Sequence, residues 1–312
     1  LWKLTGIPPE IAFQLAMATV SGLLVAATFS LTGTLVRDLL GARRMIVIVG
    51  GGALGVLVYV VLGNLDPLIQ ILSGQSPANL DFWRSSRVID YAITEFPYFT
   101  QLYGDLHPHA IALPMTVLLL ALAYVAITGI GHGLLWAVVT ALVVGSIIVT
   151  NSWDAPFTVA VLFAALISGA FRTKHDLAWR LVRTIGGGAA VTIGALLLFL
   201  PFLARFVPMV GGIAPTTSGT APAQYILHFG VFFIVLCSAG VAWLVGNGPT
   251  TRHRREESAI AASSAAVGLV ATWLLRTGDA PSGANLLLTA AAIAGFHEPS
   301  RGGPGSQPGL LI

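Results

Sequence analysis

The chain has 312 residues, of which 55% are hydrophobic and only 9% are charged, and its net charge is +3. A soluble domain is usually about 25% charged, so this composition excludes an ordinary water-soluble protein. The basic residues lie in short loops between apolar runs, which the orientation rule of membrane proteins explains better than a nucleic-acid partner. The apolar runs are roughly 17–25 residues long, the length of a membrane-spanning helix, and lack the short alternating pattern of a barrel strand.

In chain order, the apolar runs predict a polytopic bundle of about eight to nine transmembrane helices, an all-α fold. The expected spans are residues 11–36, 45–63, 110–128, 134–150, 157–171, 184–204, 225–246, 258–275 and 284–296. We assign residues 1–296 to one transmembrane domain and interpret the Gly/Pro-rich segment 297–312 as a disordered tail. The glycines of segments 50–55 and 186–188 lie in or beside spans, which indicates close helix packing.

Most lysines and arginines lie in alternate loops, which predicts the orientation in the cell membrane. The loops expected to face the cytoplasm are 37–44, 129–133, 172–183 and 247–257. Those expected to face outward are 64–109, 151–156, 205–224 and 276–283. Nearly all the unusual polar motifs therefore belong to the outer face.

The outward loop 64–109 is long for a connection between spans. Its segment 79–93 alternates apolar and charged residues, which predicts an amphipathic helix lying on the membrane surface. Arg84 and Arg87 would share one face of that helix, either as a clamp for a phosphate group or as interfacial anchors.

The segment 95–109 concentrates ionisable and aromatic residues at the end of this loop. Asp105, His107 and His109 are two residues apart, and Pro108 disfavours the α conformation at His107. In an extended chain the three side chains would point the same way and could bind one metal ion or one phosphate. In a second geometry the next helix begins at Pro108, which places His109 beside an anion-attracting helix N-terminus.

Two other interpretations of these residues remain open. The histidines could simply end a span with hydrogen bonds to the backbone. Glu95 could be a solvated carboxylate near Arg84 or Arg87. If Glu95 instead enters one cleft with Asp105, repulsion would separate the pKa values of the two carboxyl groups, which suits one of them for general-base chemistry.

The motif "TNSWDAP" at 150–156 lies on the same predicted face. Asp154 stands before the fifth span as a candidate N-cap. Asn151 and Trp153 offer an amide and an aromatic platform of the kind that contacts sugar rings. No Asp, Glu, Lys or Arg lies in the middle of a predicted span, which favours chemistry at the membrane interface over ion-coupled transport.

Four motifs in this order resemble the DUF2298 family, also called Chlor_Arch_YYY, of multi-spanning membrane proteins. They are "FWRSSRVI" (82–89), "EFPYFTQLYGDLHPHAIALP" (95–114), "TNSWDAPF" (150–157) and "QYILHFGVFF" (224–233). The resemblance implies a GT-C glycosyltransferase-like protein that takes sugar from a polyprenyl-phosphate donor at the outer membrane face. It also implies an acidic residue in an outer loop, often with a divalent metal, and that the family's N-terminal part precedes Leu1.

We therefore expect a membrane-embedded glycosyltransferase, with Asp105 as base or metal ligand and Glu95 as the second acid. His107 and His109 would bind the metal or the donor phosphate. The remaining expected substrate-binding residues are Arg84 and Arg87 for the phosphate, Asn151 and Trp153 for the sugar, and Asp154. Mg²⁺ or Mn²⁺ is the expected metal and membrane lipid the expected partner, without nucleic acid. The alternatives are a lipid or small-solute transporter or flippase and a non-catalytic subunit of an envelope complex.

Overall fold

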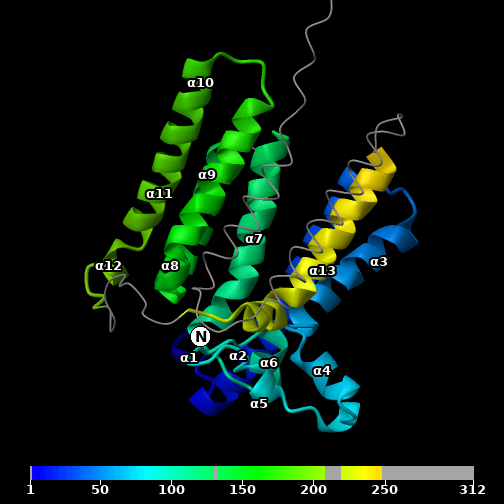
Figure 1. Cartoon of the computed structure of the whole chain (residues 1–312). Coiled ribbons are helices and arrows are strands. Elements are labelled where there is room, and N and C mark those ends of the chain that lie inside the picture. Colours follow the sequence, from blue (N-terminus) through cyan, green and yellow to red (C-terminus); the bar gives the residue numbers. More distant parts are fainter. Residues whose placement is uncertain (1, 130–132, 208–218, 248–312) are drawn as a thin grey trace, which may run out of the picture. The chain divides into compact units, whose positions relative to one another are not determined.

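The computed structural model describes residues 2–129, 133–207 and 219–247 (Figure 1). Within these ranges the regular elements are helices, with no strand. The chain divides into two compact units, Leu1–Gly63 with Glu95–Ile213 (unit 1) and Asn64–Thr94 with Ala214–Ile312 (unit 2). The prediction of an all-helical fold is thus confirmed.

Most of the helices in the described ranges belong to unit 1. They are α1 (Trp2–Thr5), α2 (Pro9–Leu39), α3 (Met45–Val56), the π-helix η1 (Leu57–Val61), α6 (Pro97–Leu102), α7 (Pro108–Thr128), α8 (Leu134–Thr150), the 3₁₀ turn η3 (Ser152–Asp154), α9 (Ala155–Phe171), α10 (Leu177–Leu181), the π-helix η4 (Val182–Gly186), α11 (Gly187–Leu198) and α12 (Leu200–Leu203). Unit 2 contains α4 (Asp66–Leu72), the 3₁₀ turn η2 (Pro77–Asn79), α5 (Phe82–Ser85) and α13 (Pro222–Asn247).

Among the described residues, four helices are long and apolar enough to cross a membrane: Pro9–Leu39, Pro108–Thr128, Ser152–Phe171 and Leu177–Leu198. A fifth is added if Met45–Val61 and Asp66–Leu72 are counted as one broken span. The helices Leu134–Thr150 and Pro222–Ser238 are apolar but shorter. The expected spans 258–275 and 284–296, and the tail 297–312, lie outside the described residues, so the count of eight to nine stays a prediction.

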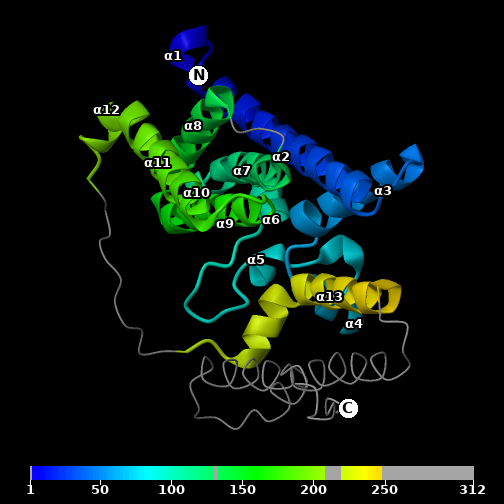
Figure 2. The same ribbon diagram turned by 90° about the horizontal axis from the view of Figure 1, so that it is seen from above.

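The main core of unit 1 forms where α7, α8, α9 and α11 pack together (Figure 2). Its buried residues include Leu119 on α7, Ile147 on α8, Leu162 on α9 and Ala195 on α11. Small residues let these helices approach closely, as in membrane proteins generally. A second, smaller cluster joins α2, η1 and α7.

Glycines mark the closest helix contacts, as predicted. A Cβ at Gly52 of α3 would lie 2.8 Å from the Phe29 ring of α2, and one at Gly188 of α11 would lie 2.6 Å from the Phe163 ring of α9. At these two positions the missing side chain lets the neighbouring helices pack closely.

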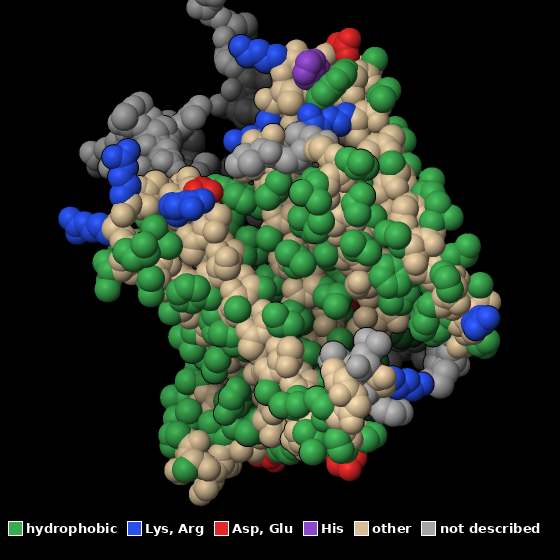
Figure 3. Space-filling model, turned by 180° about the vertical axis from the view of Figure 1, so that it is seen from behind, with side chains coloured by type: hydrophobic (Ala, Val, Ile, Leu, Met, Phe, Trp, Pro, Cys, Tyr) green, Lys and Arg blue, Asp and Glu red, His purple; other side chains and the backbone are tan. Residues whose placement is uncertain are grey.

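Apolar side chains also cover the outside of the helices. Leu54, Leu118, Leu142 and Ile167 are all more than 40% exposed. In one face of the molecule, apolar side chains fill a broad area and the lysines and arginines lie toward its edges (Figure 3). Helices that are apolar all round are typical of a lipid environment.

The arginine-rich segments of unit 1 lie at one end of its helices, opposite the starts of α7 and α9. The Tyr124 hydroxyl, near the end of α7, donates to Asp38 Oδ2 at 3.1 Å, so the C-terminal ends of α2 and α7 lie together. The charge of Arg172, which follows α9, also acts on Tyr124. The segments 37–44 and 172–183, rich in arginine, therefore share one end, and the starts of α7 and α9 lie at the other.

The amphipathic helix predicted over 79–93 is wrong. The helix α5 is only four residues long: the Asp81 side chain caps its start by accepting from the Arg84 N–H at 2.9 Å, and after Ser85 the Ser86 hydroxyl donates back to the Trp83 carbonyl at 2.7 Å. Tyr91 then has a φ of 59°, which a helix cannot accommodate. In this loop, local side-chain hydrogen bonds determine the backbone conformation more strongly than the apolar periodicity does.

Candidate functional site

Glu95 is positioned by the aromatic residues that follow it. Phe96 precedes α6 with an extended backbone, and Pro97 opens the helix. Phe96 and Phe99 are only 6% and 2% exposed, and α6 packs against η1. The Phe96 ring lies so close to the Cα of Gly63 that a Cβ there would collide with it. The buried rings therefore fix the backbone from which the Glu95 side chain projects.

His107 and His109 are positioned by the start of α7. His107 is the N-cap residue with an extended backbone (φ −66°, ψ 152°), and Pro108 is the first residue of the helix. The prediction that Pro108 keeps His107 out of the α conformation and opens the helix is confirmed. His109 is helical, so the fully extended arrangement of Asp105, His107 and His109 is wrong.

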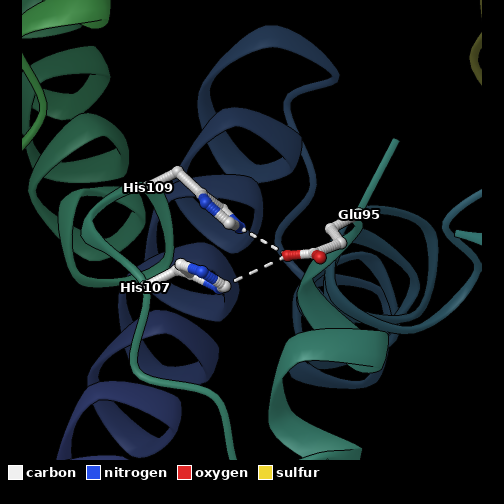
Figure 4. A group of neighbouring side chains, drawn as sticks. All are labelled: Glu95, His107 and His109. Atoms are coloured by element: carbon white, nitrogen blue, oxygen red, sulfur yellow. Dashed lines mark ion pairs between the residues drawn. The ribbon is translucent and has the colours of Figure 1, made fainter. Parts of the chain in front are cut away.

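The two imidazole rings face the Glu95 carboxylate (Figure 4). Glu95 Oε2 lies 3.5 Å from His107 Nδ1 and 3.7 Å from His109 Nε2. The rings stack with centroids 5.4 Å apart. The Glu95 side chain is 7% exposed, whereas those of His107 and His109 are 46% and 40% exposed. The arrangement places a nearly buried carboxylate behind two imidazoles that solvent can reach.

Asp105 joins this group from the solvent side. Its Oδ2 lies 2.7 Å from His107 Nδ1, and its side chain is 45% exposed. His107 therefore lies between two carboxylates of different environment. We call Glu95, Asp105, His107 and His109 the α7 cluster.

The "TNSWDAP" motif lies at the same end of unit 1. Asn151 ends α8 and Asp154 precedes α9, where its backbone is helical and its side chain makes no capping hydrogen bond. The charge of Asp154 acts on His109. Trp153 is 69% exposed. Asp154 thus lies within electrostatic reach of the α7 cluster, and the capping interpretation of its side chain is wrong.

Tyr59 is not among the site residues predicted from the sequence. It lies in the π-helix η1 and is half-buried, and the charge of Asp154 acts on its hydroxyl. Single-turn π-helices often occur at functional sites. The sequence signal for this residue was a tyrosine that lies four residues before a glycine, at the end of an apolar run.

Arg84 and Arg87 belong to unit 2 and have other partners there. Arg84 Nη2 bonds to Asp66 Oδ1 at 2.9 Å. Arg87 Nη1 donates to the Ser86 carbonyl at 2.8 Å, and its guanidinium lies 4.8 Å from the centre of the Trp83 ring. Both arginines thus have structural roles in unit 2, and their role as a phosphate clamp stays a prediction.

The apolar helices and the polar cluster at one of their ends define an all-helical membrane protein with a candidate site at a helix boundary. A family model described as "Uncharacterized membrane protein (DUF2298)" matches residues 1–302, so the chain belongs to this family. No curated protein and no solved structure matches the chain.

Proposed function

We propose that the α7 cluster is the catalytic centre of a membrane-embedded glycosyltransferase of GT-C type that uses a polyprenyl-phosphate sugar at the outer face of the cell membrane. The observation that carries the proposal is the pairing of a nearly buried carboxylate, Glu95, with an exposed one, Asp105, around His107. Two carboxylates in different environments suit different steps of one reaction.

In the proposed reaction Asp105 is the base, because an acceptor hydroxyl can reach its exposed carboxylate. It takes the proton while the acceptor oxygen bonds to the anomeric carbon and the bond from that carbon to the phosphate oxygen breaks, releasing polyprenyl phosphate. Glu95 holds the two imidazoles at the start of α7, where the helix N-terminus favours the phosphate charge. Trp153 offers an exposed ring for the sugar.

The test is sugar transfer from labelled polyprenyl-phosphate sugars in membranes, comparing the wild type with Asp105→Asn. Loss of the base is expected to slow transfer by about 10²- to 10⁴-fold. Glu10→Gln, at an exposed carboxylate in the first turn of α2, is the control and should keep the wild-type rate. Unchanged transfer by Asp105→Asn would remove Asp105 from catalysis, and solute or lipid movement without transfer would favour a transporter.

The proposed orientation has a separate test by cysteine labelling. The only cysteine of the sequence, Cys237, is exposed, so it is first replaced by serine. In intact cells, a membrane-impermeant maleimide should label Ser152→Cys, near the α7 cluster, at once. Lys174→Cys, in the basic loop, should react only after permeabilisation, because the positive loops remain inside. The opposite pattern would place the cluster in the cytoplasm.

A further inference from the structure

We infer that Glu95, His107 and His109 form a binding site for one divalent transition-metal ion at the start of α7. The catalytic use of that ion rests on the function proposed above. The binding itself rests only on the geometry of the three side chains, so it can be tested separately.

The distances between the three side chains fit a common ion. One candidate ligand atom from each residue lies within 4.8 Å of the other two. Ligand atoms about 2.1 Å from a tetrahedral metal lie about 3.4 Å apart. Glu95 Oε2 is 3.5 Å from His107 Nδ1 and 3.7 Å from His109 Nε2. Both distances to Glu95 are close to this spacing, as expected for ligands of one ion.

The contacts of Glu95 with the two imidazoles are longer than direct hydrogen bonds. An N–H···O hydrogen bond has a donor–acceptor distance of about 2.7–3.2 Å, shorter than both contacts to Glu95. His109 Nε2 is buried and makes no hydrogen bond in the part of the chain that the structure describes. A metal ion would give this buried nitrogen a partner and would neutralise the charge of the nearly buried Glu95 carboxylate.

The donor set also selects the kind of metal. Two imidazoles and one carboxylate suit Zn²⁺, Mn²⁺, Fe²⁺ or Co²⁺, whereas Mg²⁺ and Ca²⁺ prefer oxygen ligands alone. Three protein ligands are typical of catalytic metal sites, which keep a position open for water or substrate. The exposed sides of His107 and His109 leave that position accessible, and an oxygen of a sugar-phosphate donor fits it.

Asp105 is not one of the three proposed ligands. Its Oδ2 lies 2.7 Å from His107 Nδ1, the nitrogen that the ion would take, so metal binding breaks this contact. The ligand set therefore differs from the sequence-based expectation of Asp105, His107 and His109, because the nearly buried Glu95 takes the place of Asp105. Asp105, released from His107, stays available as the proposed base.

The test is metal binding by the full chain, purified without a polyhistidine tag, in lipid nanodiscs. After removal of metal with a chelator, Zn²⁺ and Mn²⁺ are titrated against a chromophoric competitor, with Mg²⁺ in a parallel series. We expect one Zn²⁺ per chain and binding weaker by at least about 100-fold in Glu95→Gln and in His109→Gln, because each variant loses one of the three ligands. Mg²⁺ should not compete at equal concentration.

The controls are Glu10→Gln and His175→Gln, which change an exposed carboxylate and an exposed imidazole that are not members of the cluster. Both should bind Zn²⁺ like the wild type. Circular dichroism of the metal-free variants separates lost binding from lost folding. Less than half an equivalent of Zn²⁺ in a folded wild type, or wild-type affinity in a folded Glu95→Gln variant, would overturn the site. One bound Zn²⁺ without sugar transfer would overturn the proposed function and leave the site intact.

Discussion

Replacing Asp66 by alanine is expected to open the folded segment 64–94 of unit 2. The Asp66 carboxylate is 1% exposed and accepts three hydrogen bonds, from Gln70 Nε2 at 2.7 Å, Ser85 Oγ at 2.8 Å and Arg84 Nη2 at 2.9 Å. Arg84 is 55% exposed and can be hydrated, whereas Gln70 and Ser85 are buried. Hydrogen bonds to a charged group contribute about 1.5–3 kcal/mol each, so losing those from Gln70 and Ser85 costs about 3–6 kcal/mol. Amide hydrogen exchange of residues 81–86 should accelerate by about 10²- to 10⁴-fold, measured by mass spectrometry in nanodiscs.

Two further variants separate the contributions to this network. Asp66→Asn keeps one acceptor oxygen and should have an intermediate effect. Arg84→Ala removes only the partner of Asp66 Oδ1, which leaves the buried carboxylate with its two neutral donors. Asp90→Asn, at an exposed carboxylate of the same unit, should exchange like the wild type. Wild-type protection of residues 81–86 in Asp66→Ala would show that other contacts hold this segment.

The apolar pattern predicted most helices of unit 1 well. The span expected at 134–150 is observed as Leu134–Thr150, and that at 110–128 begins only two residues earlier, at Pro108. The agreement has a physical cause, since a lipid environment cannot satisfy backbone groups and each apolar run must bond within itself as a helix.

The polar loop could not be predicted in the same way. Its fold depends on Gln70, whose amide bonds both ways with the backbone of Asp81, eleven residues away. No sequence period reveals such a pairing. The period of 79–93 indicated one helix, whereas α5 has only four residues, with Asp81 capping its start and the Ser86 hydroxyl donating back to the Trp83 carbonyl at its end.

The sequence predicted the backbone conformation at the start of α7, but it did not show that Glu95 faces both imidazoles. The rules for proline correctly gave the start of α7 and the extended His107. From the sequence, Glu95 is expected as a second acid beside Asp105, and Asp105 is expected in the metal set with the two histidines. Glu95 faces both imidazoles because Phe96 packs against Gly63, a contact between segments 33 residues apart in sequence.

Replacing Gly63 by alanine is therefore expected to weaken Zn²⁺ binding by the α7 cluster, although Gly63 is not a member of the cluster. Gly63 has a φ of +38°, and an added Cβ would collide with the Phe96 ring. Phe96 is 6% exposed and cannot move freely, so relief of the collision should shift the neighbouring Glu95. We expect about 1–3 kcal/mol of destabilisation, as in other overpacked cores, and Zn²⁺ binding weaker by at least about 10-fold, measured by competition titration.

Two further variants test whether the contact between Gly63 and Phe96 causes the loss of Zn²⁺ affinity. Gly41→Ala has a similarly positive φ of +63° but nothing within 4 Å of the new Cβ, so it should keep wild-type Zn²⁺ affinity. The double variant Gly63→Ala/Phe96→Leu frees space beside the new methyl group and should recover part of the lost affinity, because the two positions are directly coupled. If Gly63→Ala binds Zn²⁺ as tightly as the wild type, Phe96 does not position Glu95. If the double variant loses affinity additively, the collision is not the cause, and strain at the positive φ explains the loss instead.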